Sequence, residues 1–550
     1  MPQDVDTPTP TIRPLLSVRD LEVTFGGAAE PVLHRVSFDV QPGERVAIVG
    51  QSGSGKSTII GAILRLLPGA GRISAGSILL GGDDLVSASE KHMRGVRGGR
   101  IGLVPQDPAS NLNPAMKVGA QIADSLVAHG LRGRAAIQAR VVELMTEAGI
   151  PDAERRSTQF PHEFSGGMRQ RVLIAIALAR EPELLIADEP TSALDVTVQR
   201  QILNHLQTLV ESRGTSLLFI THDLGVAADR TDRIIVMLDG TIVEVGTPAE
   251  ILLNPQHEYT RRLVAAAPTA TTVASRATAA ELGVAHKILA EPILVVENLV
   301  KVFPLRGQRG AMLRAVNDVS FSIPRGTTTA IVGESGSGKT TVARIVLGLE
   351  QATGGRASID GQTITASRGA ERAALRRKVQ PVFQDPYGSL DPTYSIERLI
   401  DEPLRIFGVG DRASRRNRVG ELLDQVALPR GIAQRRPNEL SGGQRQRVAI
   451  ARALALDPEL LICDEAVSAL DVLVQDQILE LLDSLQKRLG ISYLFITHDL
   501  AVVRQIANSV IVMKQGTIVE NGSVDDVFAH PAADYTRDLL GAIPGGAFAH

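Results

Sequence analysis

The sequence predicts an α/β fold that is built twice along the chain. Three observations lead to this prediction. The segment GQSGSGKST at residues 50–58 returns as GESGSGKTT at residues 333–341. In each copy a hydrophobic strand pattern precedes the glycine-rich loop and a helical pattern follows it, which is the order of α/β folds that bind phosphate. The chain also has 550 residues, too many for one hydrophobic core.

Composition narrows the class of protein further. Apolar residues make up 44% and charged residues 22% of the chain, as in ordinary globular proteins, and the net charge of −3 gives no simple electrostatic case for a nucleic-acid partner. We find no apolar run near the roughly 18 residues that cross a bilayer, and no signal-peptide pattern near the N-terminus. We therefore expect a cytoplasmic protein. The single cysteine, Cys463, excludes an internal disulfide and a cysteine-built metal cluster, and we expect it to be a small buried side chain.

Further repeats define the predicted domains. FSGGMRQRV at residues 164–172 matches LSGGQRQRV at residues 440–448, and the tails NPQHEYTRRLVAAAP and HPAADYTRDLLGAIP also correspond. The stretch between the two copies is rich in Ala and Thr and weakly charged, which is typical of a linker. The predicted segments are a flexible N-terminal tail at 1–14, a first domain at 15–268, a linker at 269–292 and a second domain at 293–545.

Within each copy the elements follow one order. A β-rich start is expected at residues 21–25 and 299–303, and a strand before the glycine loop at residues 45–49 and 328–332. Apolar residues at helical spacing predict an inserted helical region at residues 120–148 and 396–426. Continuous apolar runs, such as residues 184–187 and 216–220, predict buried parallel strands.

The glycine loops fit the phosphate-binding pattern G-x-x-x-x-G-K-[ST]. Glycines let successive backbone N–H groups face phosphate, the lysine adds positive charge, and the hydroxyl can bind Mg²⁺. A flexible glycine turn is the alternative, but two matches after hydrophobic strands disfavour it. The predicted nucleotide-binding residues are Gly50, Ser52, Gly53, Gly55, Lys56, Ser57 and Thr58 in the first loop and Gly333, Ser335, Gly336, Gly338, Lys339, Thr340 and Thr341 in the second.

Acidic pairs follow buried strands in both halves. Asp188 and Glu189, like Asp464 and Glu465, come after four apolar residues. Such an aspartate can hold a metal ion through water, and the neighbouring glutamate can polarise an attacking water, which contributes roughly 10² to 10⁴ in rate. Taken alone, an Asp-Glu pair after a strand is more often a solvated turn. Its position downstream of a phosphate loop in both halves favours catalysis.

The SGG segments are the most specific signal in the sequence. They comprise Ser165, Gly166 and Gly167 in the first half and Ser441, Gly442 and Gly443 in the second. With the loops and acidic pairs, they make nearly the whole chain resemble the ABC ATPases, in which SGG is the signature motif. A serine-capped helix start is also expected at each SGG, because apolar residues follow at helical spacing, and a helix start is itself a competent anion site.

The resemblance implies a RecA-like core in each domain, with an antiparallel β subdomain and an inserted α-helical subdomain. It also implies ATP and Mg²⁺ as cofactors and gives roles to further residues. Gln106 and Gln384 correspond to the Q-loop, and His222 and His498 to the catalytic switch histidine. Asp195 and Asp471 correspond to the D-loop. Phe25 and Phe303 stand where an aromatic ring stacks on adenine, although each alone is more often a core residue. The implied metal-binding residues are Ser57, Gln106, Asp188, Thr340, Gln384 and Asp464.

In ABC ATPases the halves pack head to tail, so that each ATP lies between the phosphate loop of one half and the signature of the other. One implied site joins Lys56 to Ser441, and the other joins Lys339 to Ser165. Both halves keep their catalytic residues, Glu189 with His222 and Glu465 with His498. We therefore expect both sites to hydrolyse ATP.

The resemblance narrows to the peptide and nickel uptake subfamily, and the chain resembles a fusion of its two ATPases. It implies two membrane permease subunits and a substrate-binding protein as partners, a peripheral position on the cytoplasmic face of the membrane, and uptake of di- or oligopeptides. Two departures stand out. The cysteine cluster of many relatives is missing, and Ala466 and Val467 replace the Pro190 and Thr191 of the first half. This replacement is expected to loosen the turn without abolishing catalysis.

Two other classes of protein share some of these motifs. A cytosolic twin-ABC ATPase that acts on ribosomes or nucleic acid has similar ATP sites, but such proteins usually carry a long basic inter-domain segment or a cysteine-rich N-terminal domain. An unrelated P-loop kinase or GTPase would lack the signature and the duplication. The sequence therefore favours a transporter ATPase and no nucleic-acid partner.

Overall fold

The chain divides near residue 267 into two compact units that correspond to the two sequence repeats. The computed structural model describes residues 13–26, 30–191, 194–266, 291–304, 311–364, 369–468 and 470–544. The predicted N-terminal tail and linker therefore lie outside the described residues, except for residues 13–14 and 291–292.

The first unit is built around a mixed sheet with the strand order β10-β9-β3-β8-β7-β6, in which only the β9–β10 pair is antiparallel. Its strands are β3 (Arg45–Val49), β6 (Ile101–Val104), β7 (Leu184–Asp188), β8 (Ser216–Thr221), β9 (Arg233–Leu238) and β10 (Thr241–Gly246). Strands β3, β7 and β8 are buried along nearly their whole length, as a parallel sheet covered on both faces requires.

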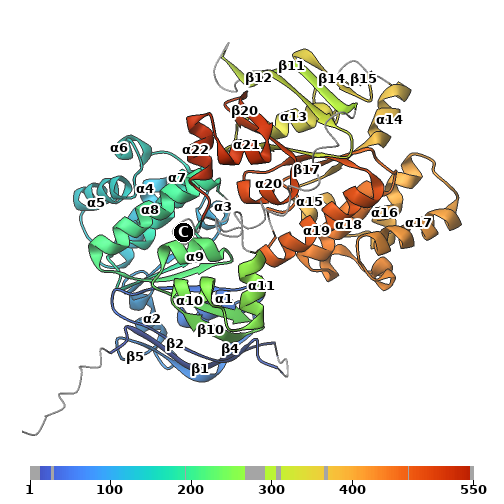
Figure 1. Ribbon diagram of the computed structural model, residues 1–550. Coiled ribbons are helices and arrows are strands. Elements are labelled where there is room, and N and C mark those ends of the chain that lie inside the picture. Colours follow the sequence, from blue (N-terminus) through green and yellow to red (C-terminus); the bar gives the residue numbers. More distant parts are fainter. Residues whose placement is uncertain are drawn as a thin grey trace, which may run out of the picture. The chain divides into compact units, whose positions relative to one another are not determined.

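A separate antiparallel sheet has the order β2-β1-β4-β5. Its strands are β1 (Leu16–Phe25), β2 (Leu33–Val40), β4 (Gly71–Leu80) and β5 (Asp83–Asp84). Figure 1 shows these strands together at one end of the first unit. Leu16 pairs with Val40 on one side and Leu80 on the other, and all three are buried. This sheet is the antiparallel β subdomain that the family resemblance implied.

An inserted helical region lies between β6 and β7. Its elements are α3 (Pro108–Asn111), α4 (Val118–Ala128), α5 (Arg134–Glu147), α6 (Ala153–Arg156), η1 (Pro161–Glu163) and α7 (Gly166–Ala177). Ile122, Leu126, Leu144 and Val172 pack into one cluster, which gives the region a hydrophobic core of its own. The helical insertion predicted for residues 120–148 is therefore confirmed.

The remaining helices of the first unit flank the two sheets. They are α1 (Lys56–Ile63), α2 (Glu90–Val96), α8 (Val196–Arg213), α9 (Leu224–Arg230), α10 (Pro248–Leu253) and α11 (Glu258–Ala266). The last two form a C-terminal extension, in which α10 contacts β9 and β10 of the central sheet.

The second unit repeats this topology in its described residues, with the sheets β12-β11-β14-β15 and β16-β17-β18-β13-β19-β20. Its strands are β11 (Pro292–Pro304), β12 (Met312–Pro324), β13 (Thr328–Val332), β14 (Gly354–Ile359), β15 (Gln362–Thr363), β16 (Val379–Val382), β17 (Leu460–Asp464), β18 (Ser492–Ile496), β19 (Ser509–Lys514) and β20 (Thr517–Ser523). Its helices are α13 (Lys339–Val346), α14 (Gly369–Lys378), α15 (Pro386–Ser389), α16 (Ile396–Ile406), α17 (Arg412–Gln425), η2 (Arg430–Gln434), η3 (Pro437–Glu439), α18 (Gly442–Leu454), α19 (Val472–Leu489), α20 (Leu500–Ile506), α21 (Val524–Ala529) and α22 (Asp534–Leu540).

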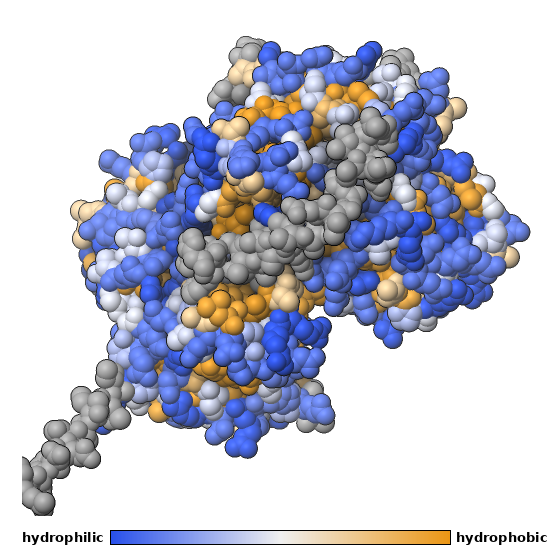
Figure 2. Space-filling model, viewed as in Figure 1, coloured by the Kyte–Doolittle hydropathy of each residue, from blue (hydrophilic) through white to orange (hydrophobic). Residues whose placement is uncertain are grey.

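Apolar side chains lie mainly inside each unit. The surface seen in Figure 2 is largely hydrophilic, with smaller hydrophobic patches. Cys463 on β17 is fully buried within a core cluster, as expected from the sequence. Among the described residues, none of the helices combines the length and the apolar character that spanning a membrane requires.

Candidate functional site

The first glycine loop connects β3 to α1 at the carboxyl end of the central sheet. Gly50 must be glycine because a Cβ there would lie 2.4 Å from the carbonyl oxygen of Met237. Gly55 precedes α1 with a φ of 99°, a left-handed conformation that glycine adopts without strain. Helix α1 therefore begins directly after the loop, and a helix N-terminus beside a glycine-rich loop is a phosphate-binding arrangement.

The lysine of each loop is buried and held by the loop's own backbone. Lys56 Nζ donates to the carbonyl oxygens of Gly50 at 2.7 Å and Gln51 at 2.9 Å. Lys339 Nζ donates in the same way to Gly333 at 2.7 Å and Glu334 at 2.8 Å. Burial lowers the pKa of Lys339. Both ammonium groups are therefore positioned over their loops by the same pair of contacts.

The acidic pairs lie at the carboxyl ends of β7 and β17. Asp188 and Asp464 are the last residues of these strands. Glu189 has a φ of 43° and Glu465 a φ of 49°, and both are therefore non-glycine residues in the left-handed region. Their N–H groups donate to Ile220 and Ile496 at 2.8 and 2.9 Å, which keeps each glutamate at the edge of its sheet.

Each glutamate contacts the glutamine and the histidine predicted to act with it. Gln106 Nε2 donates to Glu189 Oε2 at 2.9 Å, and His222 Nδ1 lies 3.1 Å from Glu189 Oε1. In the second half, Gln384 Nε2 donates to Glu465 Oε2 at 2.6 Å. His498 Nδ1 lies 3.5 Å from Glu465 Oε1. The structure thus brings together three predicted residues in each half, from segments far apart in the sequence.

The glutamate and histidine form a charge pair. Burial is the largest single influence on Glu189 and by itself would raise the pKa, but the hydrogen bond and charge of His222, together with Lys56 and Gln106, lower the pKa overall. The hydrogen bond with His498 is the main cause of the lowered pKa of Glu465. Burial opposes protonation of both histidines, yet the adjacent carboxylates raise the pKa of each. In each pair, the glutamate and the histidine thus shift each other's pKa towards the charged form.

The aspartates have the opposite shift. Burial, and then the charge of Glu189, raise the pKa of Asp188 to about 6. Burial and Glu465 likewise raise the pKa of Asp464. Ser57 hydrogen-bonds Asp188, and Thr340 Oγ1 donates to Asp464 Oδ1 at 3.4 Å.

The carboxylate and hydroxyl of each half fit a Mg²⁺ site. Two adjacent carboxylates repel each other, and a divalent cation would relieve that repulsion. Mg²⁺ is commonly held by one or two carboxylates together with substrate phosphates. No group of three or more His, Cys, Asp or Glu side chains suited to a metal occurs among the described residues. The single carboxylate and hydroxyl of each half thus fit a cation that is also bound by phosphate oxygens.

The signature serines cap helices, as predicted. Ser165 Oγ accepts from the N–H of Met168 at 3.3 Å at the start of α7, and Ser441 Oγ accepts from Gln444 at 3.3 Å at the start of α18. The residues that follow at helical spacing bury their apolar face. Each signature therefore presents a helix N-terminus, which can bind an anion.

The D-loop and adenine residues are placed as follows. Asp471 accepts from the N–H of Val474 at 3.1 Å and caps α19, while Asp195 immediately precedes α8. Phe25, at the end of β1, packs on the first core. The Lys301 ammonium lies over the Phe303 ring, 4.7 Å from the ring centroid. The two rings thus have different surroundings, and stacking on adenine stays a prediction.

The turn with the Ala466 and Val467 replacements keeps its hydrogen bonds. The N–H of Leu470 donates to Val467 at 3.2 Å, as that of Leu194 donates to Thr191 at 3.1 Å. Ser468 Oγ also donates to the carbonyl of Glu465 at 3.0 Å. The geometry gives no sign of the expected loosening.

Residues beside the histidines were missed in the sequence. The N–H groups of Asp223 and Asp499 donate to Thr221 and Thr497, each at 3.0 Å. The same aspartate side chains cap α9 and α20. Each histidine is thus fixed between a threonine and a capping aspartate. The repeated ITHDL segment was the available signal, because Thr and Asp recur with the histidine.

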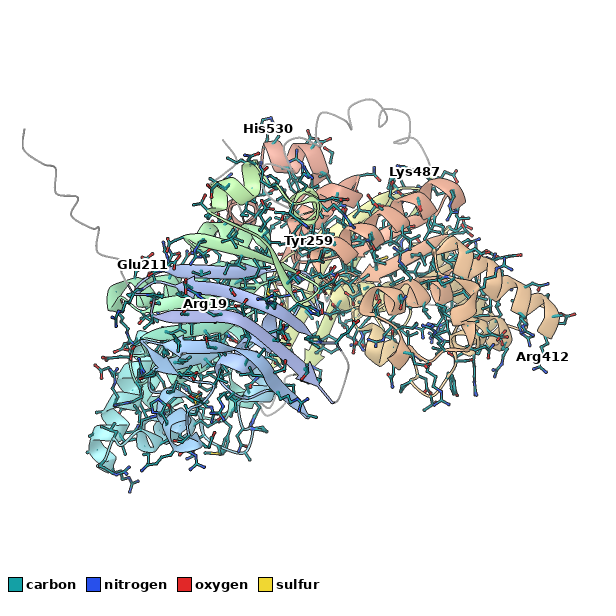
Figure 3. The ribbon with its side chains drawn as sticks, turned by 90° about the horizontal axis from the view of Figure 1, so that it is seen from below. Arg19, Glu211, Tyr259, Arg412, Lys487 and His530 are labelled. Carbon is teal, nitrogen blue, oxygen red and sulfur yellow. The ribbon has the colours of Figure 1, made fainter. Side chains whose placement is uncertain are left out.

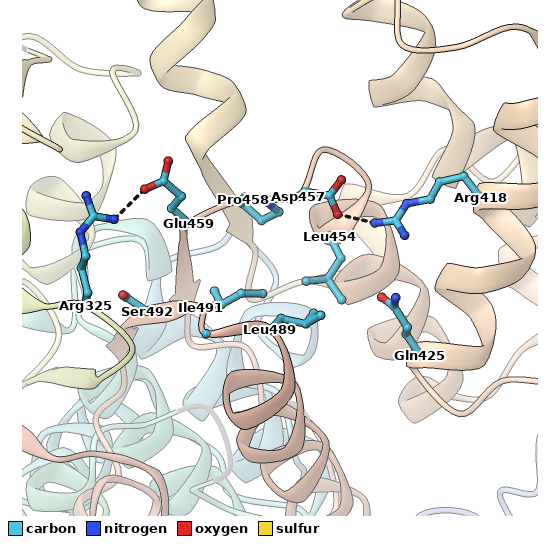
Figure 4. Close-up of a pocket in the computed structure, with 11 residues that line it drawn as sticks. Arg325, Arg418, Gln425, Leu454, Asp457, Pro458, Glu459, Leu489, Ile491 and Ser492 are labelled. Atoms are coloured by element: carbon cyan, nitrogen blue, oxygen red, sulfur yellow. Dashed lines mark hydrogen bonds and ion pairs between the residues drawn. The ribbon is translucent and has the colours of Figure 1, made fainter. Parts of the chain in front are cut away.

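Cavities occur at the other end of the central sheets. In the second unit a cavity of about 260 Å³ is lined by residues at the starts of β17 and β18 (Figure 4). Arg325 pairs there with Glu459, and Arg418 with Asp457. A cavity of about 550 Å³ in the first unit is lined by residues that include Glu183 and Ser216, at the starts of β7 and β8. Neither cavity is lined by a predicted ATP-site residue.

The fold and these groups define a P-loop nucleoside triphosphatase, because a phosphate loop with a buried lysine faces an acidic pair at the carboxyl ends of parallel strands. A family model described as ABC transporter matches residues 33–192 and 316–468. The chain therefore belongs to the ABC transporter family, and it is an ATP-binding ATPase of the transporter class. A second model, the C-terminal region of oligopeptide/dipeptide transporters, matches residues 243–287.

Several relatives match along nearly the whole chain. The Peptidoglycan transport ATP-binding protein YejF of Agrobacterium fabrum is 45% identical over 541 residues, which cover 96% of both chains. The Glutathione import ATP-binding protein GsiA of Escherichia coli K12 is 43% identical over 559 residues, which cover 96% of this chain and 89% of that protein. A solved dimeric ATP-binding cassette with ADP and Pi is 32% identical over 42% of this chain and 98% of its own, with a TM-score of 0.39.

Proposed function

We propose that this chain energises an ABC importer for di- or oligopeptides, with ATP hydrolysis at two sites. The match of residues 243–287 to the C-terminal region of oligopeptide/dipeptide transporters carries this proposal. The relatives named for glutathione import and peptidoglycan transport support it, because their substrates contain peptide. The partners in this proposal are two membrane permease subunits and a substrate-binding protein, and the chain acts at the cytoplasmic face of the membrane. The proposed domains are residues 15–268 and 293–545, joined by the linker 269–292.

In the proposed mechanism Glu189 and Glu465 are the general bases. In this structure both oxygens of Glu189 are occupied, one by Gln106 and the other by His222. When His222 turns to the terminal phosphate of ATP, it leaves Oε1 of Glu189 open to the attacking water. The same sequence applies to His498 and Glu465. The pairing thus keeps each base ionised until substrate arrives.

Ser57, Asp188 and Gln106 would hold Mg²⁺ in the first half, and Thr340, Asp464 and Gln384 in the second. Bound Mg²⁺ would neutralise phosphate charge during hydrolysis. The backbone N–H groups at the start of α1 and α13 orient the phosphates, and the buried lysines add positive charge.

The proposed sites are composite, by the head-to-tail pairing typical of the family. Ser165, Gly166 and Gly167 then complete the site of Lys339, and Ser441, Gly442 and Gly443 complete that of Lys56. The helix starts at α7 and α18 supply the chemistry for this role, since capped N-termini attract phosphate oxygens.

Glu189→Gln and Glu465→Gln test the two-site mechanism. Each substitution keeps the hydrogen bond to glutamine or histidine possible but removes the base. We expect each variant to bind Mg-ATP and to lose at least half of the steady-state phosphate release. The double variant is expected to fall by roughly 10² to 10⁴. Glu183→Gln is the matched control, because Glu183 is at the opposite end of β7 and pairs with Arg100. Wild-type turnover in either single variant would disprove the two-site mechanism.

Transport is tested separately. Cells that lack the chain should lose uptake of labelled glutathione or a labelled dipeptide, and the wild-type chain should restore it. A chain with Lys56→Ala and Lys339→Ala should not restore it. Affinity purification should recover permease subunits. Recovery of ribosomes instead, with unchanged peptide uptake, would refute the importer proposal while leaving the ATPase intact.

A further inference from the structure

A tyrosine of each C-terminal extension contacts the phosphate loop of its own unit. The N–H of Gln51, the second residue of the first loop, donates to the Tyr259 hydroxyl at 2.9 Å. The N–H of Glu334, the second residue of the other loop, donates to the Tyr535 hydroxyl at 2.9 Å. Tyr259 is 5% and Tyr535 8% exposed. Figure 3 labels Tyr259 within the first unit. The same contact therefore occurs in both units, between corresponding residues of the repeat.

Carboxylates on the last strands fix where each extension begins. Glu244 on β10 accepts from the N–H groups of Gln256 at 2.7 Å and His257 at 3.0 Å. Glu520 on β20 accepts from Ala532 at 2.8 Å and Ala533 at 3.1 Å. Burial alone would raise the pKa of both carboxyl groups, but these bonds contribute to lowering it. The helices α11 and α22 are thereby anchored to the central sheets just before their tyrosines.

The tyrosine and the lysine of the loop form hydrogen bonds with opposite sides of one peptide group. Between Gly50 and Gln51, the N–H donates to Tyr259, and the carbonyl oxygen of Gly50 accepts from Lys56 at 2.7 Å. A peptide group is planar and rigid, and hydrogen bonds at its two ends polarise each other. In the second unit the chain of contacts runs from Tyr535 through the peptide of Gly333 and Glu334 to Lys339. The position of the tyrosine therefore affects the position of the lysine through one rigid peptide group.

We propose that Tyr259 and Tyr535 are positioning residues, through which each C-terminal extension sets the ATP affinity of its own phosphate loop. The hydroxyl is the essential part, because it satisfies a loop N–H and orients the peptide that holds the lysine. Burial raises the pKa of Tyr535 to about 12, so the phenol stays neutral near pH 7 and can accept this bond.

The test places Tyr259→Phe in a chain that also carries Lys339→Ala and Glu189→Gln. In this chain, ATP binding reports on the first loop alone. Lys339→Ala disables the second loop, and Glu189→Gln prevents consumption of ATP. Calorimetric titration with Mg-ATP should show a Kd raised roughly threefold to tenfold, as expected for one lost hydrogen bond to a buried group. In a chain with Lys339→Ala alone, which still hydrolyses ATP, Tyr259→Phe should raise the KM for ATP by the same factor. It should lower kcat by a smaller factor.

Two controls separate positioning from general loosening. Tyr535→Phe in the same background makes the same chemical change beside the disabled loop, and it should alter the Kd less than twofold. Tyr493→Phe removes another buried tyrosine hydroxyl, which donates to Leu482 at 2.8 Å away from either loop. It should lower the unfolding temperature while leaving the Kd for Mg-ATP unchanged. In a Lys56→Ala and Glu465→Gln background, the roles of the two extension tyrosines should be exchanged.

An unchanged Kd in Tyr259→Phe would overturn the proposal. An equal rise in Tyr493→Phe or in the Tyr535→Phe control would also overturn it, because the effect would then not pass through the loop of the same unit. Neither result would count against the ATPase activity of the wild-type chain, which is measured separately.

Discussion

Asp188→Asn is expected to stabilise the protein purified without nucleotide while it impairs hydrolysis. The pKa of Asp188 is raised from 3.8 to about 6 by burial and by the charge of Glu189. A carboxyl group whose pKa is higher in the folded than in the unfolded chain destabilises the folded state once it ionises. The amide has nearly the same shape and carries no charge, so the substitution removes this cost.

The size of the effect follows from the shift. A rise to about 6 corresponds to about 3 kcal/mol of destabilisation at pH 7.5 and to about half of that at pH 5. The cost is complete above the folded pKa and disappears as pH falls towards the unfolded value. In a domain of this size, each kcal/mol changes the unfolding temperature by roughly 2 to 4 °C.

The assay is urea unfolding followed by circular dichroism, without Mg²⁺, at pH 7.5 and pH 5. Asp232→Asn is the control of opposite sign. Burial tends to raise the pKa of Asp232, but hydrogen bonds from Arg45 outweigh it and lower the pKa. This variant should therefore be less stable than the wild type at pH 7.5. If Asp188→Asn also proved less stable than the wild type at that pH, the electrostatic reasoning would be wrong.

Three further predictions follow from the site. The pKa of His222 is raised by Glu189. The charge pair therefore stabilises the fold below the ordinary histidine pKa, and this stabilisation is lost as pH rises through the pKa of the folded state. Urea unfolding should show that His222→Gln is more destabilising at pH 6 than at pH 8.5. Gly50→Ala would place a Cβ 2.4 Å from the Met237 carbonyl, and it should cost about 1 to 3 kcal/mol in unfolding experiments and weaken Mg-ATP binding in titrations. Ser441→Ala removes the cap of α18 and should cost about 1 kcal/mol by thermal unfolding, whereas Ser441→Asn should restore most of that loss.

The elements near the loops were predictable because their signals are local. Strands β3 and β13 have the predicted bounds of residues 45–49 and 328–332, since each is a short strand pattern with an apolar end that leads into a glycine loop. The helix start at Ser165 was also predictable, because a serine cap and the apolar spacing lie within a few residues. Local patterns of this kind need no knowledge of tertiary contacts.

Contacts between distant segments were not predictable from residue patterns alone. The meeting of Gln106, Glu189 and His222 was expected only through the family resemblance, because the three residues are separated by long stretches of chain. Tyr259 was visible as part of a repeated tail, but its contact with Gln51 spans most of the first unit's sequence. The left-handed backbone at Glu189 was also unforeseen, since nothing in the local sequence asks for a positive φ.

The presence of both units on one polypeptide has a genetic consequence. In a protein assembled from two identical subunits, every substitution appears twice. Here a codon change alters one half alone. The halves already differ at corresponding positions of the repeat, because Ser57 corresponds to Thr340 and Pro190 to Ala466. Each molecule also contains one copy of either half, whatever the level of expression. The two halves can therefore diverge in sequence while their stoichiometry stays fixed.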